Sequence, residues 1–111
     1  DEISISGPST VVRLGQTAAR IGPEDAGLNR HAAEALKGGD AQYNALALRR
    51  LLAGMQETAQ DAAYRDAVLL NSAAALMVAG HADDWHSGVE EAAEAIDKGL
   101  AKALLDCWMR F

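Results

Sequence analysis

KGGDAQYNALALRRLLAGMQETAQDAAYRDAVLLNSAAALMVAG, residues 37–80, contains two helices of different character. The second is predicted from about Arg65 to Ala79, with Arg65-Asp66 at its start, and only Asn71 and Ser72 interrupt its apolar run from Ala67 onward. A helix that is apolar on nearly every side is typical of a fully enclosed position. We therefore expect this helix to be buried all round.

The first helix of the segment is predicted from Ala41 toward Ala53, directly after Gly38-Gly39-Asp40. The glycines end the preceding structure, and the Asp40 carboxylate can cap the new helix. Leu51 lies beside a stripe formed by Ala41, Ala45, Leu48 and Leu52. This spacing predicts an amphipathic helix with one face toward the core.

The first part of the chain has the alternation of extended structure. Ile3 and Ile5 alternate with serines, and Thr10–Leu14 and Thr17–Ile21 flank Gly15-Gln16, a composition typical of a tight hairpin turn with a positive φ at Gly15. A two-stranded ribbon is marginal by itself and leaves open edges. We therefore expect this hairpin to join a sheet whose other strands the sequence does not contain.

Helical signals dominate from residue 23 onward. Pro23 begins a short turn that Gly27 ends, a second short helix is predicted over Arg30–Leu36, and Met55–Tyr64 is the least regular stretch. Either Asp84 or Ser87 can cap the next helix, and we favour Asp84 as the cap. A final helix, Leu100–Met109, follows Gly99 and has an apolar stripe of Leu100, Ala103, Leu104 and Cys107. The chain thus divides into residues 1–22, with the hairpin, and residues 23–111, mainly helical.

Composition and charge exclude several classes of protein. The 111 residues carry a formal net charge of −6, which opposes capture of a phosphate backbone, so we expect no nucleic-acid partner. The longest apolar run is too short for a bilayer, which requires about 20 residues. The acidic start DEISIS has no features of a secretory signal, and one cysteine, Cys107, fits a reducing compartment. These observations predict a cytoplasmic protein that does not enter a membrane.

Four segments together resemble one known family. They are DEISISGP at residues 1–8, PEDAGL at 23–28, the 37–80 segment, and HSGVEEAAEAIDKG at 86–99. In this combination the chain resembles the C-terminal part of the anthranilate phosphoribosyltransferase family along essentially its whole length. The resemblance implies an α/β fold: the C-terminal part of the larger α/β domain of a nucleoside-phosphorylase or phosphoribosyltransferase type, with a β-hairpin followed by several helices.

The resemblance assigns a metal role to the first two residues. In this family an Asp-Glu pair before such an Ile-Ser segment binds the metal that accompanies phosphoribosyl pyrophosphate, so Asp1 and Glu2 are expected to bind Mg²⁺, which prefers hard oxygen ligands. Without the resemblance, an acidic dipeptide is usually a solvated surface pair. The resemblance further implies transfer of the phosphoribosyl group to anthranilate in tryptophan biosynthesis by a Mg²⁺-dependent enzyme that is a homodimer as the full protein. No residue of this chain is assigned a catalytic or cofactor-binding role.

Some features of the family are missing from the chain. Its Gly-rich GTGGD loop and its Lys-His-Gly-Asn segment do not occur here, and Gly38-Gly39-Asp40 is interpreted as a helix stop and cap. We therefore expect the 111 residues alone to be inactive. Two alternatives are open: a related pyrimidine-nucleoside phosphorylase, or a non-catalytic helical module that docks through apolar helix faces.

Several other residues are expected to be structural. Arg49-Arg50 and Arg65 are interpreted as solvated charges or helix-end partners, and Cys107 as a small core residue rather than a nucleophile. Trp85 and Trp108 are interpreted as packing anchors near helix ends, because no basic groove accompanies them.

Overall fold

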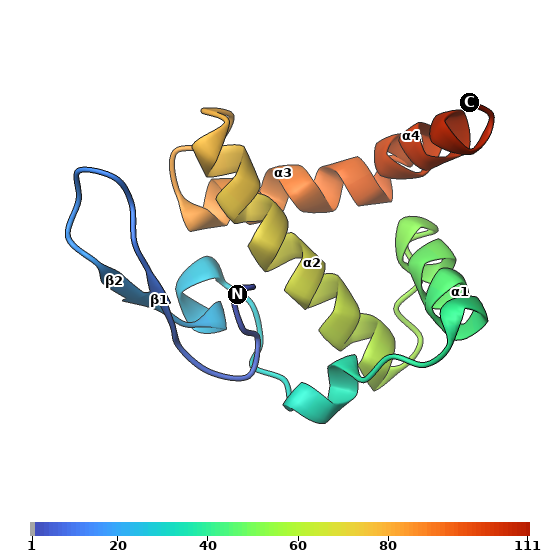
Figure 1. Cartoon of the computed structure of the whole chain (residues 1–111), viewed down its shortest axis with the longest axis horizontal. Coiled ribbons are helices and arrows are strands. Elements are labelled where there is room, and N and C mark those ends of the chain that lie inside the picture. The colour runs from blue at the N-terminus through green and yellow to red at the C-terminus, as the bar shows by residue number, and fades with distance from the viewer. Residues whose placement is uncertain (1) are drawn as a thin grey trace.

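A computed structural model of the chain describes residues 2–111, in which a small hairpin lies beside an arrangement of helices (Figure 1). The longest helix, α2, runs through the middle of the molecule, with α3 and α1 packed against it. The elements are β1 (Ser9–Val11), β2 (Ala19–Ile21), the 3₁₀ turns η1 (Pro23–Ala26) and η2 (Ala33–Leu36), α1 (Ala41–Leu52), α2 (Ala59–Val78), α3 (Trp85–Asp97) and α4 (Leu100–Met109).

The predicted hairpin is present, but its register differs from the prediction by one residue. Val11 pairs with Ala19, whereas a turn centred on Gly15-Gln16 would place Val11 opposite Arg20. The cause is the turn itself: the Gln16 N–H donates to the Arg13 carbonyl over 3.1 Å, so Gly15 is the third residue of the turn, where its φ of +76° is required. Within the described residues the sheet consists of β1 and β2 alone.

Both predicted short helical segments are present, each as a short 3₁₀ turn. Pro23 begins η1, and Gly27 ends it with a φ of +75°, as a C-terminal glycine is expected to do. The second predicted helix, over Arg30–Leu36, is shorter than expected and forms only the η2 turn, which ends at Lys37 before Gly38 is reached.

Helix α1 has the predicted cap, but its predicted apolar stripe is buried only toward the C-terminal end. The Asp40 carboxylate accepts a hydrogen bond of 2.8 Å from the Tyr43 N–H. Leu51 is buried and Leu48 is half-buried, while Ala41 and Ala45, which were expected on the core-facing stripe, are exposed. The core contacts of α1 come from its C-terminal half, where Leu48 and Leu51 pack in the cluster that contains Leu69.

Helix α2 begins six residues before the predicted start. Thr58 caps it by accepting a hydrogen bond from the Asp61 N–H at 3.1 Å, while the Asp61 carboxylate accepts one from the Thr58 N–H at 3.1 Å. This reciprocal capping box brings part of the stretch interpreted as irregular into the helix. Arg65-Asp66 therefore lies within α2 rather than at its start.

Two apolar clusters form the core, and adjacent residues of α2 belong to different ones. Leu70 packs with Ile5, Ala26 and Ala63, whereas Leu69 packs with Leu51, Ala92 and Ile96. The prediction that α2 is buried all round is wrong for this chain, since Val78 near its C-terminal end is 87% exposed. Contacts from η2, α1 and α3 cover parts of α2, while Ala75 and Val78 in its last turn are exposed.

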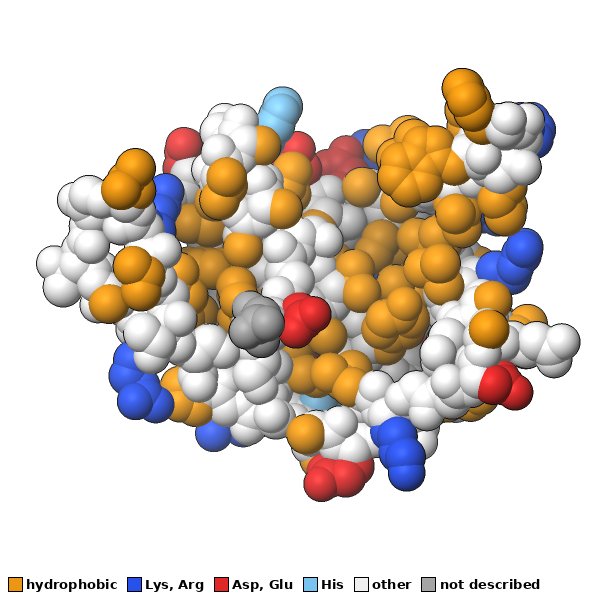
Figure 2. All heavy atoms as spheres, in the orientation of Figure 1, with side chains coloured by type: hydrophobic (Ala, Val, Ile, Leu, Met, Phe, Trp, Pro, Cys, Tyr) orange, Lys and Arg blue, Asp and Glu red, His pale blue; other side chains and the backbone are white. Residues whose placement is uncertain are grey.

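The predicted boundaries of the last helices are confirmed, but the environment of α4 is not. Asp84 caps α3 by accepting a hydrogen bond of 2.8 Å from the Ser87 N–H, and Gly99, with a φ of +75°, separates α3 from α4. The expected apolar stripe of α4 is exposed, including Leu100, Leu104 and the Cys107 thiol. Apolar side chains gather on the hollow face between α1, α2 and α4 (Figure 2).

The two tryptophans differ in their packing. Trp85 packs against the cluster that contains Leu70, as a packing anchor is expected to do. Trp108 is 69% exposed, so the prediction that it anchors packing is wrong in the described chain. None of the helices in residues 2–111 is both long enough and apolar enough to cross a membrane.

Candidate metal-binding segment at the start of the chain

The acidic pair assigned to metal binding stands at the start of the chain, ahead of the first core residue. Asp1 lies outside the described residues. Glu2 is exposed, and a backbone hydrogen bond lowers the pKa of its carboxyl below the ordinary 4.5. The Glu2 carboxylate is therefore charged and accessible near neutral pH, as a metal ligand must be.

The residue that follows the acidic pair is held by a side chain of α2. The Ile3 N–H donates to the Asn71 Oδ1 atom over 2.9 Å, and the Asn71 Nδ2 atom donates to the Ile3 carbonyl over 3.0 Å. Asn71 thus offers the acceptor and the donor that a neighbouring strand would offer. Its second N–H donates to the Ala67 carbonyl one turn earlier, at 2.9 Å, which orients the carboxamide.

The segment after Ile3 is attached to the core at a second point. Ile5 is 1% exposed within the Leu70 cluster, and its carbonyl accepts a hydrogen bond of 2.9 Å from the His31 N–H. The Ser4 N–H donates to the Ser9 Oγ atom over 2.9 Å. No strand forms over residues 3–6, although the predicted alternation places Ile5 inside and Ser6 outside.

The donor set of this segment fits a magnesium ion. Carboxylate oxygens are the hard ligands that Mg²⁺ prefers, and protein sites commonly supply one or two of them, with waters and substrate phosphates completing the coordination. Residues 2–111 contain no cluster of three or more histidine, cysteine or acidic side chains arranged for a metal. An acidic pair that shares its ion with a diphosphate needs no such cluster.

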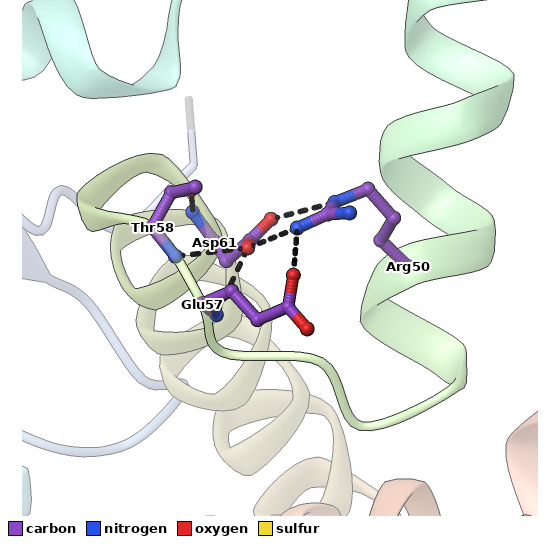
Figure 3. A network of polar contacts seen from close by, with 4 residues as sticks. All are labelled: Arg50, Glu57, Thr58 and Asp61. Atoms are coloured by element: carbon purple, nitrogen blue, oxygen red, sulfur yellow. Dashed lines mark hydrogen bonds and ion pairs between the residues drawn. The ribbon is translucent and has the colours of Figure 1, made fainter.

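A second polar network joins α1 to the start of α2 (Figure 3). The Arg50 guanidinium donates through Nε to the Asp61 Oδ1 atom at 3.1 Å and through Nη2 to Oδ2 at 2.6 Å, and Glu57 lies 3.6 Å from Nη2. The Arg50 bonds, supported by the Thr58 N–H and hydroxyl, lower the pKa of Asp61 from its ordinary 3.8 to about 2. Arg50 is therefore a fixed partner of Asp61 rather than a solvated charge.

This network borders an open groove of about 680 Å³ between η2, α1 and the start of α2. The groove includes Gly38 from the Gly38-Gly39-Asp40 sequence, but the neighbouring Gly39 N–H donates to the Asn44 Oδ1 atom over 2.9 Å, and Asp40 caps α1. These backbone and side-chain groups are engaged within the helix start, as the interpretation of a stop and cap requires.

The structure decides between the two interpretations of Arg65 and shows a further pair that the sequence pattern does not reveal. Arg65 is 7% exposed and forms an ion pair with Asp97, the last residue of α3, so it is a helix-end partner rather than a solvated charge. The His31 Nε2 atom lies 2.7 Å from the Asp66 Oδ2 atom, joining the loop before η2 to α2. Sequence separation conceals both pairs, since their members lie 32 and 35 residues apart.

Comparison with known sequences shows the family. The model of the glycosyl transferase family, a/b domain, matches residues 1–102. The chain therefore belongs to that family. It is similar to an anthranilate phosphoribosyltransferase of Novosphingobium aromaticivorans, with 55% identity over 98% of the chain and 32% of the relative. The chain thus spans about a third of the length of the curated relatives it matches.

Solved structures show the same likeness and confirm the expected fold. The anthranilate phosphoribosyltransferase of Thermus thermophilus superposes with a TM-score of 0.84 at 37% identity, over 93% of this chain and 30% of that one. Two variants of the Saccharomyces cerevisiae enzyme superpose with TM-scores of 0.81 and 0.79 at 27% and 25% identity, each over 96% of this chain and over 30% and 31% of theirs. The first is in complex with 4-fluoroanthranilate, and the second has Mg bound.

Proposed function

We propose that this chain is part of an anthranilate phosphoribosyltransferase, which transfers the phosphoribosyl group of phosphoribosyl pyrophosphate to anthranilate in tryptophan biosynthesis. Similarity to that enzyme over 98% of the chain, at 55% identity, carries the proposal. The 4-fluoroanthranilate complex of a yeast relative supports the substrate class. In the full protein, the chain supplies the hairpin and the last helices of the larger α/β domain, with residues 1–22 and 23–111 as its two parts.

In this proposal Asp1 and Glu2 hold Mg²⁺, and the yeast structure with Mg bound supports the ion. When bound, the ion stabilises the negative charge that gathers on pyrophosphate as it leaves. The anthranilate nitrogen forms a bond to the ribose C1 atom, the C1–O bond breaks, its electron pair remains on pyrophosphate, and the ammonium proton passes to solvent. Glu2 positions the ion and moves no proton.

The chain contributes only part of this activity. The Gly-rich loop and the Lys-His-Gly-Asn segment that the family uses do not occur in these 111 residues. Orientation of anthranilate against the sugar carbon, which can supply a large share of the acceleration, must come from the remainder of the protein. We place the full enzyme in the cytoplasm as a homodimer.

A thermal-stability measurement tests the proposal. A ligand that binds only the native state raises the melting temperature. The longer protein that includes this chain should melt at a higher temperature in Mg²⁺ with phosphoribosyl pyrophosphate than in either alone, and replacement of Asp1 and Glu2 by alanine should abolish the difference. A non-catalytic helical module would show no response to the pair of ligands, and that result would contradict the proposal.

A further inference from the structure

We propose that Asn71 is a positioning residue, which holds Glu2 in place for the divalent ion. The inference rests on the proposed metal role of the acidic pair and goes one step beyond it. Asn71 acts on Glu2 through Ile3, whose N–H belongs to the peptide that joins the two residues.

The geometry limits the movement of that peptide. The bond of 2.9 Å to the Ile3 N–H holds the Glu2–Ile3 peptide, and the bond of 3.0 Å to the Ile3 carbonyl holds the following Ile3–Ser4 peptide, so the backbone on both sides of Ile3 is attached to α2. The third bond, to Ala67, fixes the carboxamide itself. Because Leu70, the preceding residue of α2, is fully buried, the helix that carries Asn71 provides a rigid base.

Only a carboxamide of this length satisfies the arrangement. An aspartate offers acceptors but no donor for the Ile3 and Ala67 carbonyls, and a leucine of similar shape offers neither. Residues that hold a metal-binding group typically change metal affinity by 10–100-fold when they are replaced. Asn71 bonds the main chain next to Glu2 and not its carboxylate, so its support reaches the carboxylate through the backbone.

Loss of Asn71 should act locally rather than unfold the segment. Ile5 remains buried in the core, and the His31 N–H still donates to its carbonyl. The Ile3 backbone loses its two hydrogen bonds to α2, while the Ile3 side chain still packs against the Leu70 cluster. Metal affinity should therefore respond more strongly to this change than global stability.

The chain offers a matched control in Asn44. Its carboxamide makes the same pair of bonds to a single residue, accepting from the Gly39 N–H at 2.9 Å and donating to the Gly39 carbonyl at 3.1 Å. Asn44 lies on α1, far along the chain from the acidic pair. Replacing it removes a contact of the same kind without touching Ile3.

The test uses the longer protein that includes this chain, with Mn²⁺ as the probe ion and pyrophosphate present. Electron paramagnetic resonance of free Mn²⁺ gives the dissociation constant, and calorimetry gives the melting temperature. We expect Asn71→Leu to raise the dissociation constant about tenfold. Asn44→Leu should change the Mn²⁺ dissociation constant by no more than about twofold, even if the substitution lowers the melting temperature.

The outcomes separate this inference from the function on which it rests. Unchanged Mn²⁺ affinity in Asn71→Leu, with affinity lost in Glu2→Ala, would overturn the positioning role alone. Unchanged affinity in Glu2→Ala would overturn the metal role and the inference together. If Asn71→Leu does not fold, Asn71→Ser, whose side chain is too short to reach both Ile3 groups, provides the same comparison.

Discussion

Arg65 of α2 and Asp97, the last residue of α3, form an ion pair in which the cation is buried and the anion is half exposed. The Arg65 Nη2 atom donates to the Asp97 Oδ2 atom over 2.9 Å, and Nη1 lies 2.9 Å from Oδ1. The Nη1 and Oδ1 atoms are close enough for an ion pair but do not form a hydrogen bond. Nη1 therefore has no hydrogen-bond partner in the described chain. The pair joins the N-terminal half of α2 to the C-terminal end of α3, two helices that pack against each other.

Removal of the Asp97 carboxylate should lower the free energy of unfolding more than removal of the Arg65 guanidinium does. Asp97→Ala leaves a buried guanidinium without its partner, and we expect a loss of about 1–2 kcal/mol, reduced by water reaching the exposed side of the pair. Arg65→Met, of similar size, removes the charge itself and should be nearly neutral. Urea unfolding of the full protein measures both values.

A double variant provides the control for this prediction. Arg65→Met with Asp97→Ala should resemble Arg65→Met alone, since no buried charge is then left unpaired. If Asp97→Ala matches the parent protein in stability, the buried pair does not hold α2 and α3 together.

The Asp61 network predicts a specific dependence of stability on pH. Because folding lowers the pKa of Asp61 from 3.8 to about 2, its contribution to stability is fully present above about pH 4.5 and is lost as the pH falls toward 2. Asp61→Asn removes this contribution. The stability difference between parent and variant, measured by urea unfolding at intervals from pH 6 to pH 3, should be constant above about pH 4.5 and narrow below it. A difference that is constant down to pH 3 would show that Arg50 does not shift this carboxyl.

The contact of α2 with α3 depends on a glycine. A Cβ atom on Gly88 would lie 2.8 Å from both the Cα and the Cβ atoms of Ala73. Gly88→Ala should therefore destabilise the protein, since the overpacking cost of about 1–3 kcal/mol exceeds the helix-propensity gain of up to about 1 kcal/mol.

A compensating change checks the cause of this loss. Ala73→Gly combined with Gly88→Ala removes one of the two contacts and should recover part of the lost melting temperature. If the melting temperature does not recover, the loss in Gly88→Ala has a cause other than the close approach of α2 to α3.

Local signals in the sequence predicted the helix boundaries more accurately than the packing. Asp40, Asp84 and Gly99 occupy the predicted cap and break positions, because capping depends on residues three or four apart. The start of α2 was missed although the same kind of signal, Thr58 with Asp61, was present. The one-residue error in the hairpin arose from the position of Gly15 within its turn.

Packing and the candidate site depend on contacts that a sequence pattern does not display. Arg65 is buried because its partner lies on another helix, and α4 is exposed although its stripe is apolar. The acidic pair was found through resemblance to a family. Asn71, by contrast, looked like an interruption of an apolar helix, and its partner Ile3 lies 68 residues away.

The isolated 111 residues should lack transferase activity. The groups that cradle pyrophosphate and orient anthranilate are expected from the remainder of the protein, and binding energy supplied by them cannot act when they are missing. Anthranilate fluorescence in the presence of phosphoribosyl pyrophosphate and Mg²⁺ should stay constant with this chain alone. Measurable turnover would place a complete active site within residues 1–111.

Anthranilate consumption by the longer protein, followed by fluorescence with and without alanine at Asp1 and Glu2, decides whether the chain belongs to a transferase that uses these carboxylates. We expect Mg²⁺-dependent consumption that collapses in the doubly substituted protein while its fold is retained. Absence of consumption by the unsubstituted protein, or equal consumption by both proteins, would contradict this expectation.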